Sequence, residues 1–210
     1  EDSSGLGRWS YLTVEGQGGQ KITFITAYRL CQGAMKGTTT NCIQQRNVLN
    51  NQEMAKGQKT STPDTNFLRM KFIEELTLFI ISLQEEGHAI VLGLDANETP
   101  QEAMKDGLIR EGSISWLLAQ TGLQEVFDLH HSVTPDSTTT TPGRFIDRVA
   151  VYGLDIQRAT ILRANEPAKS DHLAIVIDID LKALFPNACS PLTKPLPRNL
   201  TSGNSASVRR

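Results

Sequence analysis

The feature that most constrains this fold is an amphipathic helix followed directly by a strongly apolar strand. Its apolar residues recur at i, i+1, i+4, i+7, i+8 and i+11, one stripe of a 3.6-residue repeat: Phe72, Ile73, Leu76, Phe79, Ile80 and Leu83. Pro63-Asp64-Thr65 supplies start signals and Gly87 a stop signal. "HAIVLGLD" at 88–95 then predicts a short buried strand. A helix that covers a sheet predicts an α/β protein.

The remaining chain adds strands more often than helices. "WSYLTVE" and "KITFITAYR" around the Gly-rich "GQGGQ" predict a β-hairpin over residues 9–29. Further strands are predicted at "EVFDLHH" (125–131), at "RFIDRVAVY" (144–152) and over 173–180, and a helix over 114–120. Residues 31–66 are polar and predict an irregular excursion with a short helix near 44–51.

The length of 210 residues, with 39% hydrophobic and 21% charged residues, is typical of one globular domain. We expect that domain to span 1–184, and the Pro-, Ser- and Asn-rich segment 185–210 to be a basic linker or tail. The expected fold class is α/β: a partial four-layer α/β sandwich, with two packed mixed β-sheets flanked by helices. Five or six strands are few for two sheets, so we expect the early strands of such a fold to be missing.

The charge and the cysteine content limit the cellular compartment and the classes of binding partner that we expect. The net charge is −2, and residues 181–210 hold five basic and no acidic residues, so the rest of the chain is more acidic than the total. That balance argues against broad electrostatic binding of nucleic acid. Three cysteines at unrelated spacings favour a reducing compartment, and no apolar run is long enough to cross a membrane. We expect an intracellular protein, in the nucleus or cytoplasm, with no membrane partner.

Polar residues gather where the predicted strands end, which is where a rigid scaffold presents chemical groups. They are Tyr28 after "FITAY", Asp95 and Asn97 in "LGLDANE", Asp147 in "RFIDRVAVY", and Asp171-His172 at the head of "LAIVIDID". Each has a purely structural alternative. Asp95-Ala-Asn97 could form an Asx turn, Asp147 could pair with Arg148 on the surface, Tyr28 could be core, and His172 could be a turn histidine. Their joint occurrence at strand ends favours one site.

These motifs resemble a known superfamily. "TAY", a helix, an apolar strand ending in Asp-x-Asn, Ile-Asp in a strand and Ser-Asp-His before a last strand are similar to the endonuclease/exonuclease/phosphatase superfamily. The resemblance covers residues 8 to about 181. Within the superfamily, "GRWSYLTVEGQGGQKITFITAYRLCQ", "QQR" at 44–46 and "DANE" look most like the endonuclease-like domains of non-LTR retrotransposons.

The resemblance implies a hydrolase that cleaves phosphodiesters, with roles for six residues. Asp171 would bind the divalent metal, Mg²⁺ or alternatively Mn²⁺, and His172 would contact the scissile phosphate. Asp147 would orient His172, Asp95 would orient or deprotonate the attacking water, and Asn97 and Tyr28 would hydrogen-bond the phosphate. The implied partners are the DNA backbone and a downstream reverse transcriptase domain of the same polyprotein.

The sequence also departs from the superfamily pattern. The superfamily carries a metal-binding Glu and an Asn on earlier strands, and this chain begins too late to contain either. We therefore expect a fragment of a longer polyprotein or a truncated element copy. Two other functions stay open: a phosphoesterase for a small substrate such as a phosphoinositide, and a catalytically inactive domain that binds nucleic acid or a partner.

Overall fold

The structure is a computed structural model and describes residues 2–16, 18–32, 41–56, 63–131, 135, 137–162, 170–182 and 185. Its main sheet has five strands in the order β1-β2-β3-β7-β6. Their bounds are Trp9–Glu15 for β1, Lys21–Tyr28 for β2, His88–Asp95 for β3, Gln124–Glu125 for β6 and Asp147–Tyr152 for β7. Strands β2 and β3 are parallel and the other neighbours are antiparallel, so the sheet is mixed.

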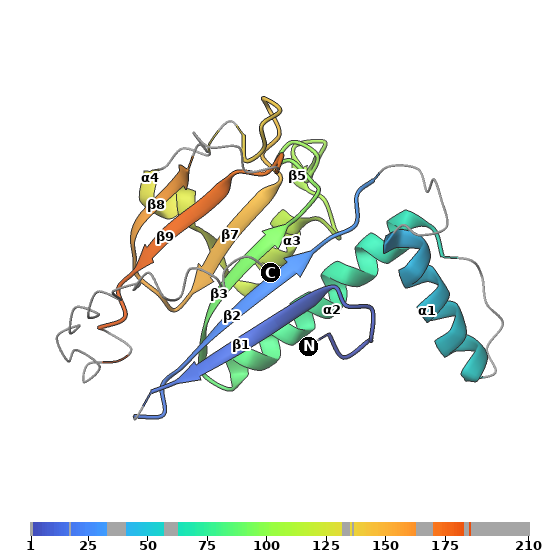
Figure 1. The fold of residues 1–210 in the computed structure, drawn as a ribbon, viewed down its shortest axis with the longest axis horizontal. Coiled ribbons are helices and arrows are strands. Elements are labelled where there is room, and N and C mark those ends of the chain that lie inside the picture. The colour runs from blue at the N-terminus through green and yellow to red at the C-terminus, as the bar shows by residue number, and fades with distance from the viewer. Residues whose placement is uncertain are drawn as a thin grey trace, which may run out of the picture.

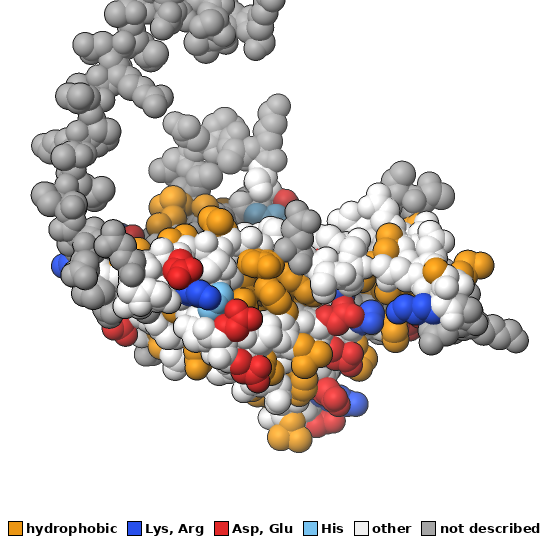
Figure 2. Space-filling model, turned by 90° about the horizontal axis from the view of Figure 1, so that it is seen from below, with side chains coloured by type: hydrophobic (Ala, Val, Ile, Leu, Met, Phe, Trp, Pro, Cys, Tyr) orange, Lys and Arg blue, Asp and Glu red, His pale blue; other side chains and the backbone are white. Residues whose placement is uncertain are grey.

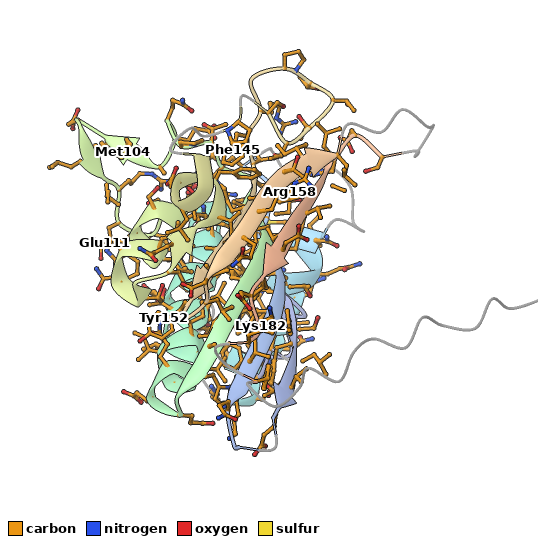
Figure 3. All side chains as sticks on the ribbon, turned by 90° about the vertical axis from the view of Figure 1, so that its left-hand side faces the viewer. Met104, Glu111, Phe145, Tyr152, Arg158 and Lys182 are labelled. Atoms are coloured by element: carbon orange, nitrogen blue, oxygen red, sulfur yellow. The ribbon has the colours of Figure 1, made fainter. Side chains whose placement is uncertain are left out.

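Two smaller antiparallel pairs and four helices complete the described fold (Figure 1). The pairs are β4 (Met104–Lys105) with β5 (Leu108–Ile109), and β8 (Ile156–Leu162) with β9 (Ala174–Ile179). The helices are α1 (Asn41–Ala55), α2 (Thr65–Glu85), α3 (Ile114–Thr121) and α4 (Val126–His131). The β4–β5 hairpin, where Met104 is labelled, projects beyond the body of the molecule (Figure 3).

One face of the main sheet packs on α2 and α3. The side chain of Asp64 caps α2 by accepting a hydrogen bond from the backbone N–H of Phe67 at 2.7 Å. The predicted apolar stripe forms the centre of this core, with Phe72, Ile73, Leu76, Ile80 and Leu83 buried and Phe79 packed against them. Each such side chain contributes roughly 1.5–3 kcal/mol by burial. The predictions of this helix and of the strand after it are confirmed.

The other face of the sheet carries the β8–β9 pair. Ile22 of β2 and Val91 and Val151 of β3 and β7 belong to this second core, together with Ile175 and Ile177 of β9. Along β9 the exposed and half-buried residues alternate, as predicted for a strand with one inward face. The predicted fold class is confirmed: two β-sheets pack face to face in an α/β protein with helices. Phe185, at the start of the predicted tail, packs on this core, and the rest of segment 185–210 lies outside the described residues.

One prediction of secondary structure is wrong, and one predicted helix is longer than expected. "EVFDLHH" was predicted as a strand, but only Gln124 and Glu125 pair with β7, and the helix α4 follows from Val126. Six residues are too few to separate the two periodicities, because Val126, Phe127 and Leu129 also fit one helical turn. In the 31–66 excursion, α1 is a helix of 15 residues, nearly twice the predicted span. The helix propensity of this sequence is low. Burial of Cys42 and Leu49 in a third core stabilises the helix.

The surface of the molecule gives no reason to change the predicted α/β fold class. Seen from below, hydrophobic side chains are interspersed with acidic and basic ones on the face away from the ends of β2 and β3 (Figure 2). Among the described residues, no helix is long and apolar enough to span a bilayer. Cys31 and Cys42 are free thiols.

Candidate active site

The strand register brings three of the predicted residues into one row. Tyr28 at the end of β2 is paired with Asp95 at the end of β3, and Asp95 is paired with Asp147 at the start of β7. Directly opposed residues on neighbouring strands point to the same face of a sheet. The row therefore lies across the upper edge of the main sheet in Figure 1, where β2 and β3 end and β7 begins.

A loop beside this edge delivers His172 to the row. Thr139 forms a β-bridge with His172, and the backbone N–H of Thr140 donates to the Asp171 carbonyl at 2.8 Å. Thr138 is fully buried, and its hydroxyl accepts hydrogen bonds from the backbone N–H groups of Ile146 at 3.1 Å and Asp147 at 2.9 Å. The same loop is thus bonded to both the head of β9 and the start of β7, which fixes His172 against Asp147.

The contact between His172 and Asp147 is bidentate. Nδ1 of His172 lies 3.0 Å from Oδ1 and 2.9 Å from Oδ2 of Asp147. A proton on Nδ1 is therefore the favoured arrangement, and the Nε2 side of the ring is left for other partners. The surface-pair alternative for Asp147 is not what forms, because Arg148 is buried and pairs with Glu125 instead.

Charge around the imidazole decides its protonation. Partial burial disfavours the charged ring, but the hydrogen bond and charge of Asp147, with Asp95 and Asp171 behind it, raise the pKa of His172 above 6.5. Because the folded state binds this proton more tightly than the unfolded chain does, the resulting stability is present below pH 6.5. It is lost as the pH rises through the folded pKa.

We expect Asp147→Asn to lower the pKa of His172 in the metal-free protein, because the substitution removes the anionic partner and leaves the burial that opposes protonation. The measurement is an NMR titration of the imidazole nitrogens, assigned with His172→Ala. Asp178→Asn is the matched control, since Asp178 is an exposed aspartate on β9. An unchanged pKa in Asp147→Asn, or an equal fall in Asp178→Asn, would show that the contact does not set the charge of the ring.

Asp95 and Asn97 do form the Asx turn that the sequence allowed as an alternative. The backbone N–H of Asn97 donates to Asp95 Oδ1 at 3.1 Å, and Asn97 has a φ of 45°, in the left-handed region. Burial raises the pKa of the Asp95 carboxyl and the charge of Asp147 raises it further, against the Asn97 hydrogen bond. A carboxylate with a raised pKa is a better proton acceptor, so the turn does not exclude a catalytic role.

The side chains of Asn97 and Tyr28 meet through Cys31. Asn97 Nδ2 donates to the Arg29 carbonyl at 2.8 Å, and the Cys31 thiol donates to Asn97 Oδ1 at 3.2 Å. The Tyr28 hydroxyl lies 3.7 Å from Cys31 Sγ. Burial raises the pKa of Tyr28 to about 12, with Cys31 and Asp95 adding to the rise, so the phenol is a hydrogen-bond donor at neutral pH.

A group of buried charged residues that the sequence analysis did not predict lies next to the Asp95–Asn97 turn. Glu98 has a fully buried carboxylate, with Arg29 Nη1 at 3.0 Å, Arg69 Nη2 at 3.8 Å, and Arg110 also paired with it. The backbone N–H of Ile114 donates to Glu98 at 2.8 Å. Glu98 follows Asn97 and Arg29 follows Tyr28. Their position next to the motif residues is the sequence feature that could have pointed to them.

Arg29 and Arg69 also donate hydrogen bonds to backbone carbonyl oxygens. Arg29 Nη2 donates to the Gly112 carbonyl at 2.6 Å, while Arg69 donates to the carbonyl oxygens of Leu30 and Asn97. Burial lowers the pKa of Arg69 to about 10, with the charge of Arg29 adding to the fall. We call Glu98, Arg29, Arg69 and Arg110 the buried ion cluster.

Three of the polar groups are close enough to hold one cation. Ligand atoms of Asp95, Asp147 and His172 lie within 4.8 Å of one another. Two carboxylates suit a hard divalent ion such as Mg²⁺, and the site has no thiolate that would favour zinc. Asp171 lies at the rim: its carboxylate is 77% exposed, and its Oδ1 is 3.9 Å from His172 Nε2. Its predicted role as metal ligand stays a prediction.

Comparison with known proteins bears on the fold. No family model and no curated protein matches the sequence. The chain is similar to the structure of the human Nocturnin catalytic domain with bound sulfate anion, with a TM-score of 0.51 and 16% identity over 81% of this chain. It is also similar, with a TM-score of 0.40 and 12% identity, to D. rerio TDP2 complexed with single strand DNA product, over 80% of this chain and 60% of that one.

The Nocturnin comparison establishes a shared fold. The chain spans about half of that catalytic domain, 52% of its length. At 16% identity the likeness shows a shared α/β fold, in agreement with the predicted fold class.

Proposed function

We propose that this chain is a metal-dependent phosphodiesterase that nicks DNA. The observation that supports it best is the row of Tyr28, Asp95 and Asp147 at one sheet edge, with His172 bonded to Asp147. Hydrolysis of a phosphodiester needs a positioned water and hydrogen-bond donors for the charge that develops on the phosphate. It also needs the water and the phosphate to be held in the geometry that reacts. The same edge carries a group for each of the first two requirements.

In this mechanism four side chains act on the attacking water or on the phosphate. Asp95 accepts a hydrogen bond from the attacking water and takes its proton as the water oxygen bonds to phosphorus, which its raised pKa favours. The P–O bond on the opposite side breaks, and the leaving oxygen takes a proton from solvent. His172, protonated and held through Nδ1 by Asp147, donates from Nε2 to a phosphate oxygen. Tyr28 donates a hydrogen bond from its hydroxyl to another phosphate oxygen, and Asn97 keeps the Asp95 turn in place and offers its remaining amide hydrogen to the phosphate.

The proposed cofactor is Mg²⁺, which Mn²⁺ can replace. Asp171 is its proposed ligand by the sequence resemblance, whereas the cluster close enough to hold a cation consists of Asp95, Asp147 and His172. When bound, the ion would neutralise charge on the phosphate oxygens.

The test is a supercoiled-plasmid nicking assay with Mg²⁺, with Mn²⁺ and with EDTA. We expect open-circular product with either metal and none with EDTA. Asp171→Asn should raise the Mg²⁺ concentration for half-maximal nicking by about tenfold or more, since even outer partners of a metal change its affinity by 10–100-fold. Hydrolysis of an inositol phosphate without nicking would favour the small-substrate alternative. DNA binding without hydrolysis would favour the inactive binding domain.

We further propose that the nicking serves insertion of a mobile element whose reverse transcriptase follows in the same reading frame. The support is the sequence resemblance carried by "TAYRLCQ", "QQR" and "DANE". The expected domain of residues 1–184 and the basic linker from 185 belong to this proposal. Sequencing the reading frame on both sides tests it: a reverse transcriptase downstream supports it, and an unrelated frame contradicts it.

A further inference from the structure

We infer that Cys31 is a positioning residue whose thiol holds the side chains of Tyr28 and Asn97 at one spacing. The inference rests on the proposed function, in which both side chains donate hydrogen bonds to the phosphate. Tyr28 is the last residue of β2, whereas Asn97 lies in the turn that follows β3. The side chain of Cys31 contacts both of them, and it thereby joins the two donors through a single sulfur atom.

The two hydrogen bonds of the thiol run in one direction. Cys31 Sγ donates to Asn97 Oδ1 at 3.2 Å. Because a thiol has a single hydrogen, the Tyr28 hydroxyl, 3.7 Å from Sγ, is the donor in the second contact. Sulfur is a weak acceptor, so a phosphate oxygen can take over the hydrogen bond of Tyr28 at small cost. The thiol therefore keeps the hydroxyl in place and leaves its hydrogen bond available to the substrate.

The carboxamide of Asn97 is held at both of its ends. Nδ2 donates one hydrogen to the Arg29 carbonyl at 2.8 Å, and Oδ1 accepts the hydrogen bond from Cys31. A backbone carbonyl can only accept, so the Arg29 contact determines which end of the carboxamide is Nδ2. With the oxygen held as well, the second hydrogen of Nδ2 has a fixed direction. That hydrogen is the one that the proposed mechanism assigns to the phosphate.

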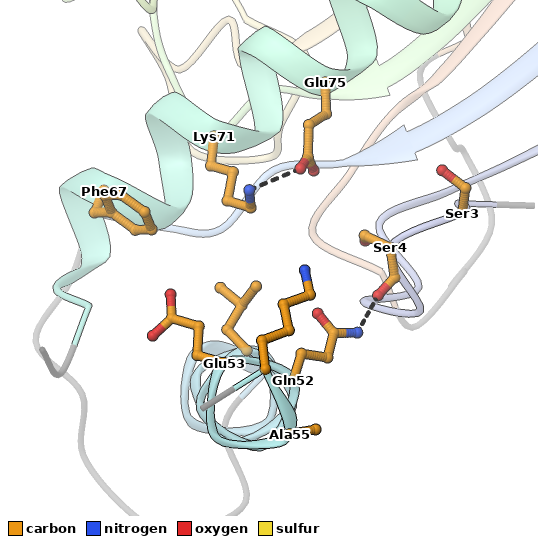
Figure 4. Close-up of a pocket in the computed structure, with 10 residues that line it drawn as sticks. Ser3, Ser4, Gln52, Glu53, Ala55, Phe67, Lys71 and Glu75 are labelled. Carbon is orange, nitrogen blue, oxygen red and sulfur yellow. Dashed lines mark hydrogen bonds and ion pairs between the residues drawn. The ribbon is translucent and has the colours of Figure 1, made fainter. Parts of the chain in front are cut away.

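The backbone just before Cys31 is anchored in the protein. Leu30 is buried in the third core with Leu49 of α1 and Leu68 of α2. Leu49 also lines the cleft between these two helices, which is shown in Figure 4. The Leu30 carbonyl accepts a hydrogen bond from Arg69 of α2. A side chain can position its neighbours only when its own backbone is held, and these contacts meet that condition.

Folding does not account for a cysteine at position 31. Free cysteine is among the residue types most often buried, and exposed thiols are avoided because they are reactive. Cys42 follows this preference, since it is buried in the third core. Cys31 is exposed, so hydrophobic burial gives it little return. Residues that depart from such preferences without a structural return are expected at functional sites.

The contact is tested without metal or DNA, by NMR of the side-chain amide of Asn97, assigned with Asn97→Ala. We expect Cys31→Ala to shift these amide resonances, because Oδ1 loses its donor. Cys31→Ser should keep them near their wild-type positions, since a hydroxyl also donates. Gln32→Ala is the matched control, an exposed neighbour outside the site. The Tm of Cys31→Ala should stay within about 2 °C of the wild type, as for other exposed residues.

The same variants are then compared in nicking of a duplex with Mg²⁺. We expect Cys31→Ala to lower kcat by about tenfold or more and to change KM by less than about threefold, because misplaced donors weaken the transition state. Cys31→Ser should lie between Cys31→Ala and the wild type, and Gln32→Ala should match the wild type. In a Tyr28→Phe background, Cys31→Ala should cost less, since part of its effect is made through the Tyr28 hydroxyl.

The two sets of measurements separate this inference from the proposed function. If Cys31→Ala shifts the Asn97 resonances but no protein nicks DNA, the contact stands and the hydrolytic function fails. If the wild type nicks DNA and Cys31→Ala nicks it at the same rate, hydrolysis stands and the positioning role fails. Unchanged Asn97 resonances in Cys31→Ala would also overturn the positioning role. A lower Tm with equal losses of kcat in Cys31→Ala and Cys31→Ser would overturn it too, because Cys31 would then be structural.

Discussion

Replacing His172 with alanine is expected to lower the rate of Mg²⁺-dependent plasmid nicking by about 10²–10⁴-fold, the range found for a positioned donor or acid–base group. The reason is geometric. Asp147 binds Nδ1 from two oxygens at 3.0 and 2.9 Å, so the ring is held in one orientation with Nε2 available to the phosphate. Alanine removes the donor and leaves the strand ends unchanged.

Binding of a labelled duplex in EDTA should change little in His172→Ala, because the lost interaction is made in the transition state. Thr140→Ala is the matched control: it removes an exposed side chain of the same loop and keeps the backbone hydrogen bond to Asp171. Asp147→Asn should also lower nicking, and adding it to His172→Ala should cost little more, since the two residues act as one unit. Equal losses of binding and cleavage in His172→Ala would contradict the catalytic role.

The fold could be predicted where one physical signal dominates. The apolar stripe from Phe72 to Leu83 and the run "HAIVLGLD" each have a single interpretation, and both formed as expected. The exchange of strand for helix at Val126–His131 has the opposite cause, because three apolar residues among six are too few to define a period. In α1, the polar sequence is a poor helix former, and the burial of Cys42 and Leu49 that stabilises it depends on other segments.

The site could be predicted as a set of residues but not as an arrangement. Strand-end positions suggested Tyr28, Asp95 and Asp147, whereas their alignment in one row depends on register, which no local pattern fixes. The contact of Asp147 with His172 depends on the bridge from Thr139, a segment that the sequence presents only as a turn-rich loop. Glu98 was overlooked because glutamate is almost never fully buried unless it is paired, and its partners are distant in the chain.

That pairing makes Glu98 the residue whose loss should cost the most stability. Replacing it with alanine or glutamine leaves the buried guanidinium groups of Arg29 and Arg69 without a carboxylate. Breaking a buried pair by removing one partner costs about 3–5 kcal/mol, because the remaining charge stays desolvated. A domain of this size has only about 5–15 kcal/mol of unfolding free energy, so the loss should be large enough to measure easily.

The measurement is urea unfolding of the wild type, Glu98→Gln and Glu111→Gln. Glu111 is exposed in the segment that links β5 to α3 (labelled in Figure 3), so its substitution makes the same change in net charge and should stay within about 0.5 kcal/mol. A double-mutant cycle with Arg29→Gln should give a coupling free energy of about 0.5–3 kcal/mol. If Glu98→Gln unfolds at the wild-type urea midpoint, the buried ion cluster does not stabilise the folded protein. The Asp95–Asn97 turn would then have to be held by its other hydrogen bonds, from the Asn97 N–H to Asp95 Oδ1 and from the Asn97 side chain to Arg29 and Cys31.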